Sequence, residues 1–79
     1  MTYEMTYIKN VFKMLNRANK LKLLETSNLT NREIELLTKR FINGDSLKDC
    51  ANYYRLEEDS INKAQLKAVK KLYKYLKYT

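Results

Sequence analysis

The residues best suited to chemistry in this chain are the amides and lysines of its last twenty positions. Residues 60–79 carry six lysines and no acidic residue, so the segment is strongly cationic. Asparagine and glutamine can pair with adenine through two hydrogen bonds, and lysine donates to guanine or to phosphate. If the segment is helical, we expect its solvent face to present Asn62, Lys63, Gln65, Leu66, Lys67 and Lys70. Such a face suits contact with a nucleic acid.

We expect these side chains to take different roles. Asn62 and Lys63 are the best candidates for base contact, whereas the later lysines are better suited to phosphates. Basic residues near helix starts and turns usually contact the DNA backbone. The candidate DNA-binding residues are Ser60, Asn62, Lys63, Gln65, Lys67, Lys70, Lys71, Arg32, Lys48 and Arg55. The alternative is a lysine face that only keeps the protein soluble, and we interpret Lys39 and Arg40 as ordinary surface of that kind.

Catalysis and metal binding find little support in the residue types. The chain has one cysteine and no histidine, which excludes a Cys/His zinc cluster and an intramolecular disulfide. It has no phosphate-cradling glycine loop and no pair of carboxylates on an apolar face. We therefore expect no enzyme activity, cofactor or metal. Cys50 is interpreted as a small buried hydrophobe, and the acidic residues 57–59 as partners of a helix dipole.

The elements that carry these residues are expected to be helices. The 79 residues suffice for one domain, and they include no proline and one glycine, the residues that punctuate strands and turns. We predict an all-α fold, a four-helix domain with an extra long N-terminal helix over residues 1–24, starting at about Thr2. The apolar stripe of this helix is broad, which indicates contact with two elements or with a second copy of the chain.

Capping signals predict where the next helices begin. Thr30 with Glu33 forms a capping box, in which each residue satisfies a backbone amide of the other, and Ser46 with Asp49 repeats the pattern. Gly44 lies between the two and supplies a stop, because glycine readily adopts the left-handed backbone that ends many helices. A short helix should follow the second box, and the last helix should begin near residue 59.

The segment from residue 44 to residue 72 has the pattern of a helix-turn-helix. Such a motif needs a small residue where its two helices cross closely, and Ala51 satisfies this requirement. It also needs an aliphatic anchor that faces back from the second helix, and Ile61 fits. Apolar residues beside the turn, which here are Cys50, Tyr54 and Leu56, lock the helices together. The second helix can then lie in the major groove with its N-terminal half toward the bases.

Residues 29–72 resemble the DNA-binding domain of LuxR-type regulators and region four of bacterial sigma factors. The shared elements are Leu29-Thr30 with Arg32-Glu33, Gly44-x-Ser46, Ala51, Ile61 and Lys70-Lys71-Leu72. The resemblance implies a DNA-binding core over 29–79, with a recognition helix from about residue 59. Arg55 departs from the pattern, because many members carry glycine there, and it would need a positive φ or a reshaped turn. Residues 1–24 match neither family.

These observations predict a single domain over residues 1–79 that acts as a sequence-specific double-stranded DNA-binding transcription regulator. The alternative is a small phage- or plasmid-type adaptor or inhibitor that binds RNA polymerase or another nucleic-acid machine. A homodimer is also open, because Leu66, Val69 and Tyr73 lie off the inward stripe of the last helix. They would pack either within one chain or across a two-fold axis. No apolar run is long enough to cross a membrane, and we expect a cytoplasmic location.

Overall fold

The computed structural model describes residues 3–78, and within this range the chain forms helices and loops without a strand. The predicted all-α class is therefore confirmed. In chain order the elements are α1 (Tyr3–Lys13), α2 (Arg17–Thr26), α3 (Asn31–Leu37), the π-helical segment η1 (Thr38–Ile42), α4 (Leu47–Tyr54) and α5 (Glu58–Lys77).

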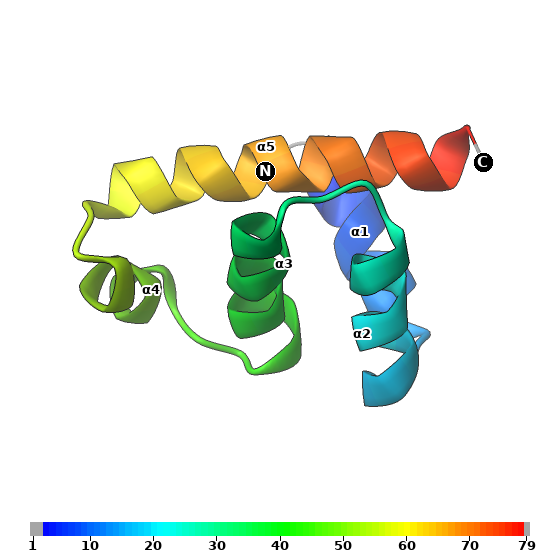
Figure 1. The fold of residues 1–79 in the computed structure, drawn as a ribbon, viewed down its shortest axis with the longest axis horizontal. Helices are drawn as coiled ribbons and strands as arrows, with labels where there is room; N and C mark the ends of the chain where they lie inside the picture. The colour runs from blue at the N-terminus through cyan, green and yellow to red at the C-terminus, as the bar shows by residue number, and fades with distance from the viewer. Residues whose placement is uncertain (1–2, 79) are drawn as a thin grey trace.

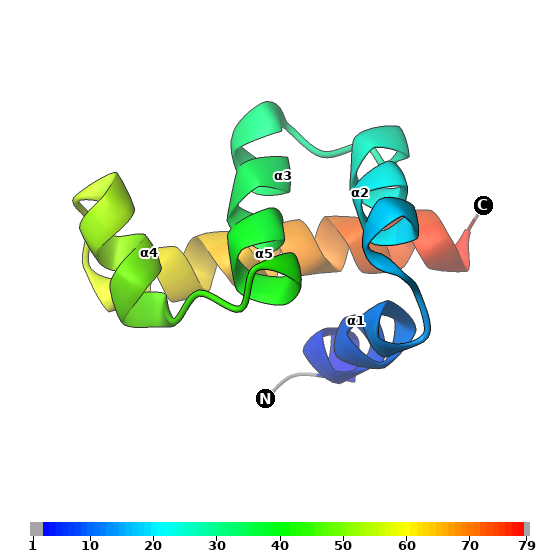
Figure 2. The same ribbon diagram turned by 90° about the horizontal axis from the view of Figure 1, so that it is seen from below.

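The longest helix, α5, is the element on which the others pack. Its 20 residues span about 30 Å. Figure 1 shows α1, α2, α3 and α4 arranged along one side of α5. Seen from below, α1 lies on one flank of α5 and α2 on the other, while α3 crosses α5 between α4 and α2 (Figure 2). The opposite side of α5, which we call its outer side, has no covering helix among the described residues.

The N-terminal region is not one helix, so the predicted long helix over 1–24 is wrong. Two helices, α1 and α2, are joined there by an elbow at residues 14–16; Thr2, the expected first residue, lies outside the described range. Asn16 has an extended backbone, and its side chain accepts a hydrogen bond from the Asn19 amide at 2.8 Å. Asparagine favours such caps over helix interiors, because its side chain competes for nearby backbone groups.

The main core lies where α1 packs against the middle of α5. Its buried members are Met5, Ile8, Phe12, Leu24, Leu37, Ala68, Val69 and Leu72. Leu66 and Tyr73 pack against this core, and the Tyr73 ring meets that of Tyr7 edge-on at 5.0 Å. Leu66, Val69 and Tyr73 were expected to pack either within one chain or across a two-fold axis. The structure shows them packed within one chain.

Both predicted capping boxes are present. The Thr30 hydroxyl accepts from the Glu33 amide at 3.2 Å, and the Glu33 carboxylate accepts from the Thr30 amide at 2.9 Å. Ser46 and Asp49 form the same reciprocal pair at the start of α4. Gly44 has a φ of +79° and follows η1, as expected of a glycine that ends a helix. These local signals set the starts of α3 and α4.

A second, smaller core holds α4 against the start of α5. Leu36, Cys50, Ala51 and Ile61 are buried in it, with Leu47 and Tyr54 packed alongside. Ala51 and Ile61 thus occupy the closely packed positions that their sizes predicted. Leu56 does not join them: its side chain is 42% exposed, because it lies in the turn at the end of the molecule (Figure 1).

The turn between α4 and α5 contains Arg55 in a left-handed conformation, with φ 57° and ψ 43°. Of the two alternatives for this position, the positive φ is the one observed. A side chain in this conformation costs about 1–2 kcal/mol, which glycine avoids.

We therefore expect Arg55→Gly to raise the free energy of unfolding by about 0.5–1 kcal/mol, after allowing for the freer unfolded chain. Urea denaturation followed by circular dichroism measures the change. The matched control is Ala64→Gly at an exposed interior position of α5, which should lower the free energy of unfolding by about 1 kcal/mol. A destabilised Arg55→Gly protein would show that the arginine is not strained.

Candidate nucleic-acid interface

A row of lysines follows the outer side of α5, opposite the buried residues of this helix. Its members are Lys63, Lys67, Lys70, Lys74 and Lys77, and all five are exposed. Their spacing alternates between four and three residues, which keeps them on one side of a helix with 3.6 residues per turn. From the first to the last they span about 21 Å. We call this row the lysine stripe.

The lysine stripe has little neutralising charge on its own helix. The acidic residues of α5 are Glu58 and Asp59 in its first turn, where they favourably meet the positive end of the helix dipole. Beyond them α5 carries no carboxylate. Ser60 is exposed in the same first turn. A row of like charges on one side of a rigid helix produces a positive field that attracts a polyanion.

Lys71 differs from the stripe lysines because it is paired. Its ammonium lies 3.0 Å from the Glu33 carboxylate, and the same carboxylate oxygen accepts from the Thr30 amide. Lys71 therefore ties α5 to the start of α3, which makes it less available for a phosphate than its neighbours. Burial alone raises the pKa of Glu33, but the hydrogen bonds from Thr30 and Lys71 outweigh it, and the net pKa is lowered from 4.5.

This depressed pKa predicts a pH-dependent contribution to stability. Because the folded state favours the Glu33 carboxylate, its contribution is present above the ordinary pKa of 4.5 and is lost as pH falls through the lower folded value. We expect Glu33→Gln to reduce the loss of unfolding free energy between pH 5 and pH 2. Denaturation at a series of pH values measures it, with Glu25→Gln on the exposed surface of α2 as the control. Equal acid sensitivity in the two variants would contradict the assignment.

The predicted outward position of Gln65 is wrong, which removes it from the exposed face proposed for DNA contact. Its side chain is 3% exposed, and its amide oxygen accepts a hydrogen bond from Arg40 Nε at 2.6 Å. Arg40 Nη1 also donates to the carbonyl of Asp45 at 2.7 Å. Arg40 is therefore a half-buried structural residue rather than ordinary surface. A buried amide needs such a partner, because an unpaired polar group in a core is costly.

Four further predicted contacts are exposed but do not belong to the stripe. Asn62 is exposed and lines a hollow together with Lys9, which places it on the α1 flank of α5. Arg32 lies on the α3 flank, where its guanidinium is 5.4 Å from the centre of the Tyr54 ring and lines a groove with Lys67. Two further candidates, Lys48 on α4 and Arg55 in the turn, are exposed. The structure thus gathers Lys63, Lys67 and Lys70 on one side of α5 and places Asn62 and Arg32 on its flanks.

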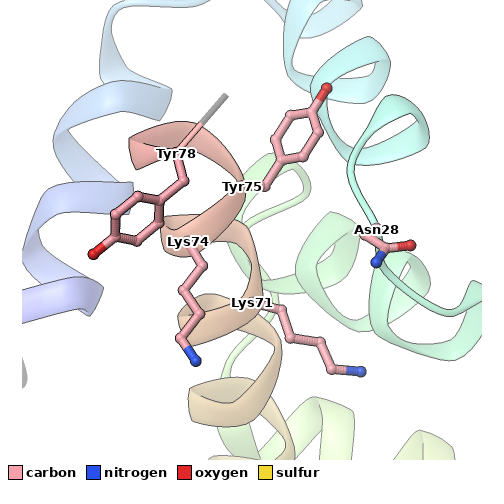
Figure 3. Close-up of a pocket in the computed structure, with 5 residues that line it drawn as sticks. All are labelled: Asn28, Lys71, Lys74, Tyr75 and Tyr78. Carbon is pink, nitrogen blue, oxygen red and sulfur yellow. The ribbon is translucent and has the colours of Figure 1, made fainter.

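A hollow of about 530 Å³ adjoins the C-terminal part of the lysine stripe. It is lined by Asn28, Lys71, Lys74, Tyr75 and Tyr78. Figure 3 shows the side chain of Lys74 running down along α5 and that of Lys71 extending to the right, away from α5, while the two tyrosine rings point away from each other. The rings therefore do not form a stacking pair, and the hollow extends the cationic surface rather than enclosing a small ligand.

Sequence reasoning assigned no role to Lys74 and Lys77, although the signal for them was present. Both continue the alternation of four and three residues that begins at Lys63, and this spacing alone places them on the same side of α5. They were not predicted as contacts because base contacts are expected in the N-terminal half of a recognition helix. Lys77 also donates to the Tyr73 hydroxyl at 3.3 Å, so the end of the row meets the aromatic cluster at α1.

Other kinds of site are not evident in the described part of the chain. No helix in residues 3–78 has the length and apolar character needed to cross a membrane. The same residues form no group of three or more histidine, cysteine or acidic side chains that could hold a metal. Cys50 is fully buried, and burial raises its pKa, which lowers the fraction of reactive thiolate.

Comparisons of the chain with protein-family models, with curated proteins and with solved structures find no significant match.

Proposed function

We propose that this protein binds double-stranded DNA through the outer side of α5 and regulates transcription. The observation that carries the proposal is the lysine stripe, a row of five exposed lysines on a helix whose opposite side is anchored in two cores. In this proposal α4, the turn at Arg55 and α5 form a helix-turn-helix. The buried Ala51 and Ile61 support that reading, as does the resemblance to LuxR-type regulators and sigma factor region four.

The dimensions of α5 suit the major groove. The groove is about 12 Å wide, and a helix with its side chains is about 10–12 Å across. The lysines of the stripe would reach phosphates beside the groove, which position the protein but carry no sequence information. Each phosphate contact adds about 0.9 to the slope of log affinity against log salt. Affinity for a duplex should therefore fall steeply as salt rises.

Sequence preference would come from the start of α5, where Asn62 and Lys63 are exposed. We expect Asn62→Ala to change which duplexes are preferred, with a discrimination loss of about 1–3 kcal/mol at one position. Lys67→Ala should instead weaken binding to all duplexes alike, because a phosphate contact is independent of sequence. Fluorescence anisotropy on a panel of duplexes separates the two effects. If neither variant alters binding, α5 is not the recognition helix.

The experiment that tests the function itself is selection of bound duplexes from a random pool at near-physiological salt. The expected result is enrichment of a short half-site, and the mass of the complex in solution shows whether one or two copies bind it. Recovery of an unselected pool, with no affinity above that for random sequence, would contradict a sequence-specific regulator.

One observation favours a second candidate function, binding to a protein such as RNA polymerase. A groove of about 310 Å³ lies between α3 and α5, and it includes the exposed Leu56 beside Leu36, Tyr54 and Ile61. An apolar groove with a basic rim suits a side chain of a protein partner. The discriminating experiment is a pull-down from bacterial lysate treated with nuclease. A stoichiometric protein partner, lost in Leu56→Asp and retained in Lys67→Gln, would favour this second function.

A further inference from the structure

A second group of cations lies away from the outer side of α5. Two adjoining hollows share Lys9 and Arg40: one of about 510 Å³ lies between α1, η1, α4 and α5, and one of about 210 Å³ lies between α1, η1 and the start of α2. The basic residues that line them are Lys9, Lys13, Lys20 and Arg40. None of these belongs to the lysine stripe, and α1 and α2, which carry three of them, lie on the side of α5 opposite its outer side (Figure 1). We call this surface the Arg40 groove.

Arg40 connects the two hollows, and its side chain is held in place. It lines both of them together with Lys9. Its Nε donates to the buried Gln65 and its Nη1 donates to the carbonyl of Asp45. Neither of these bonds uses Nη2. A guanidinium fixed in this way can hold an anion without first losing the freedom of a long side chain.

Among residues 3–78, those that line the Arg40 groove supply no negative charge to balance Arg40 and the lysines. No carboxylate belongs to the described residues that line either hollow. Lys9 and Lys13 are one helical turn apart on α1, so both amines lie on one side of that helix. Phe12 and Phe41 line the smaller hollow, with their rings edge-on at 5.7 Å. Like charges over an apolar surface repel one another, and a bound anion relieves that repulsion.

We propose that the Arg40 groove binds phosphate groups, independently of the lysine stripe. A phosphate offers several acceptor oxygens, which suits one fixed guanidinium flanked by flexible lysine amines. The same chemistry is available from a free polyphosphate and from the backbone of a nucleic acid. The groove is therefore a second polyanion site, whose basic residues all lie outside α5, although Asn62, Gln65 and Leu66 of α5 complete one wall of the larger hollow.

The test is a titration of the ¹⁵N-labelled protein with inorganic pyrophosphate at low ionic strength, in which the Arg40 Nε–H resonance reports on the groove. We expect a saturable shift of this resonance. Lys9→Gln/Lys13→Gln should weaken the binding about tenfold, because hydrogen bonds to charged groups are the stronger class. Lys13→Gln alone, at an exposed position, should weaken it by a smaller factor. The double control Lys22→Gln/Lys39→Gln removes the same charge at positions that line neither hollow and should leave the affinity within about twofold.

A second arm uses a short DNA duplex and distinguishes the two sources of phosphate. If pyrophosphate produces the saturable shift, the groove accepts free phosphates. If only the duplex is bound, and Lys9→Gln/Lys13→Gln lowers the salt slope by about 2, the groove accepts a nucleic-acid backbone. The proposal is overturned if the groove variant and the control variant bind both probes alike. Replacing the stripe lysines by glutamine should leave the pyrophosphate titration unchanged, so failure of this site and failure of α5 as a DNA-binding helix give different results.

Discussion

Replacement of Lys63, Lys67 and Lys70 together by glutamine is expected to weaken duplex binding on the order of a hundredfold at about 0.1 M salt. The three residues are exposed on one side of α5, so their removal should not disturb either core. Each lost phosphate contact also removes a counterion-release contribution. The slope of log affinity against log salt should therefore fall by about 2.7. Fluorescence anisotropy with one labelled duplex at four or five salt concentrations measures both quantities.

The control for this variant is Lys22→Gln, which removes one exposed charge on α2. It should change duplex affinity by no more than about twofold, whereas Lys67→Gln alone should change it by about fivefold. Comparison of these two single variants shows whether duplex affinity depends on where the lysine lies or only on the net charge of the protein. If the triple variant keeps the parental salt slope, the lysine stripe does not contact DNA and the proposed function fails.

Ile61→Ala is expected to lower the free energy of unfolding by about 2–5 kcal/mol, which is the usual range for an aliphatic residue truncated in a core. Ile61 is 1% exposed and belongs to the small core that holds α4 against α5. That core has few other members, so little can move in to fill the cavity. A domain of this size is only marginally stable, and a large fraction of the variant should unfold. Urea denaturation at 25 °C measures the change.

Two further variants sharpen this expectation. Ile61→Val should cost about 0.5–1.5 kcal/mol, because one methylene is removed rather than three carbons. Met14→Ala in the elbow should change stability by less than about 0.5 kcal/mol, since Met14 is 86% exposed. An Ile61→Ala protein as stable as Met14→Ala would mean that α4 is held by other contacts.

Local chemistry predicted the parts of this fold that depend on neighbours in the sequence. The two capping boxes join residues three positions apart, so their residue types were sufficient to locate the starts of α3 and α4. The elbow at Asn16 was missed because apolar residues keep helical spacing across it. The side chain of Asn16 caps α2 there, and a lone asparagine inside an apolar pattern is a weak signal.

Long-range partners explain what could not be predicted about the candidate site. Gln65 was expected on the solvent face of α5, because a polar residue is an unusual choice for a core. Gln65 is buried because Arg40, 25 residues earlier in the chain, donates to it. Val69 is buried because α1 packs against α5. Neither pairing has a signature in the sequence near α5.

The elbow at residues 14–16 offers a place to attach a reporter. Met14 is almost fully exposed and lies between the two helices rather than within either. Cys50, the one native thiol, is fully buried and its pKa is raised by burial. A thiol-directed fluorophore should therefore label Met14→Cys at the introduced position and leave the native cysteine unmodified. The dye would then lie on neither the lysine stripe nor the apolar groove, so the occupancy of each surface could be followed in the intact protein.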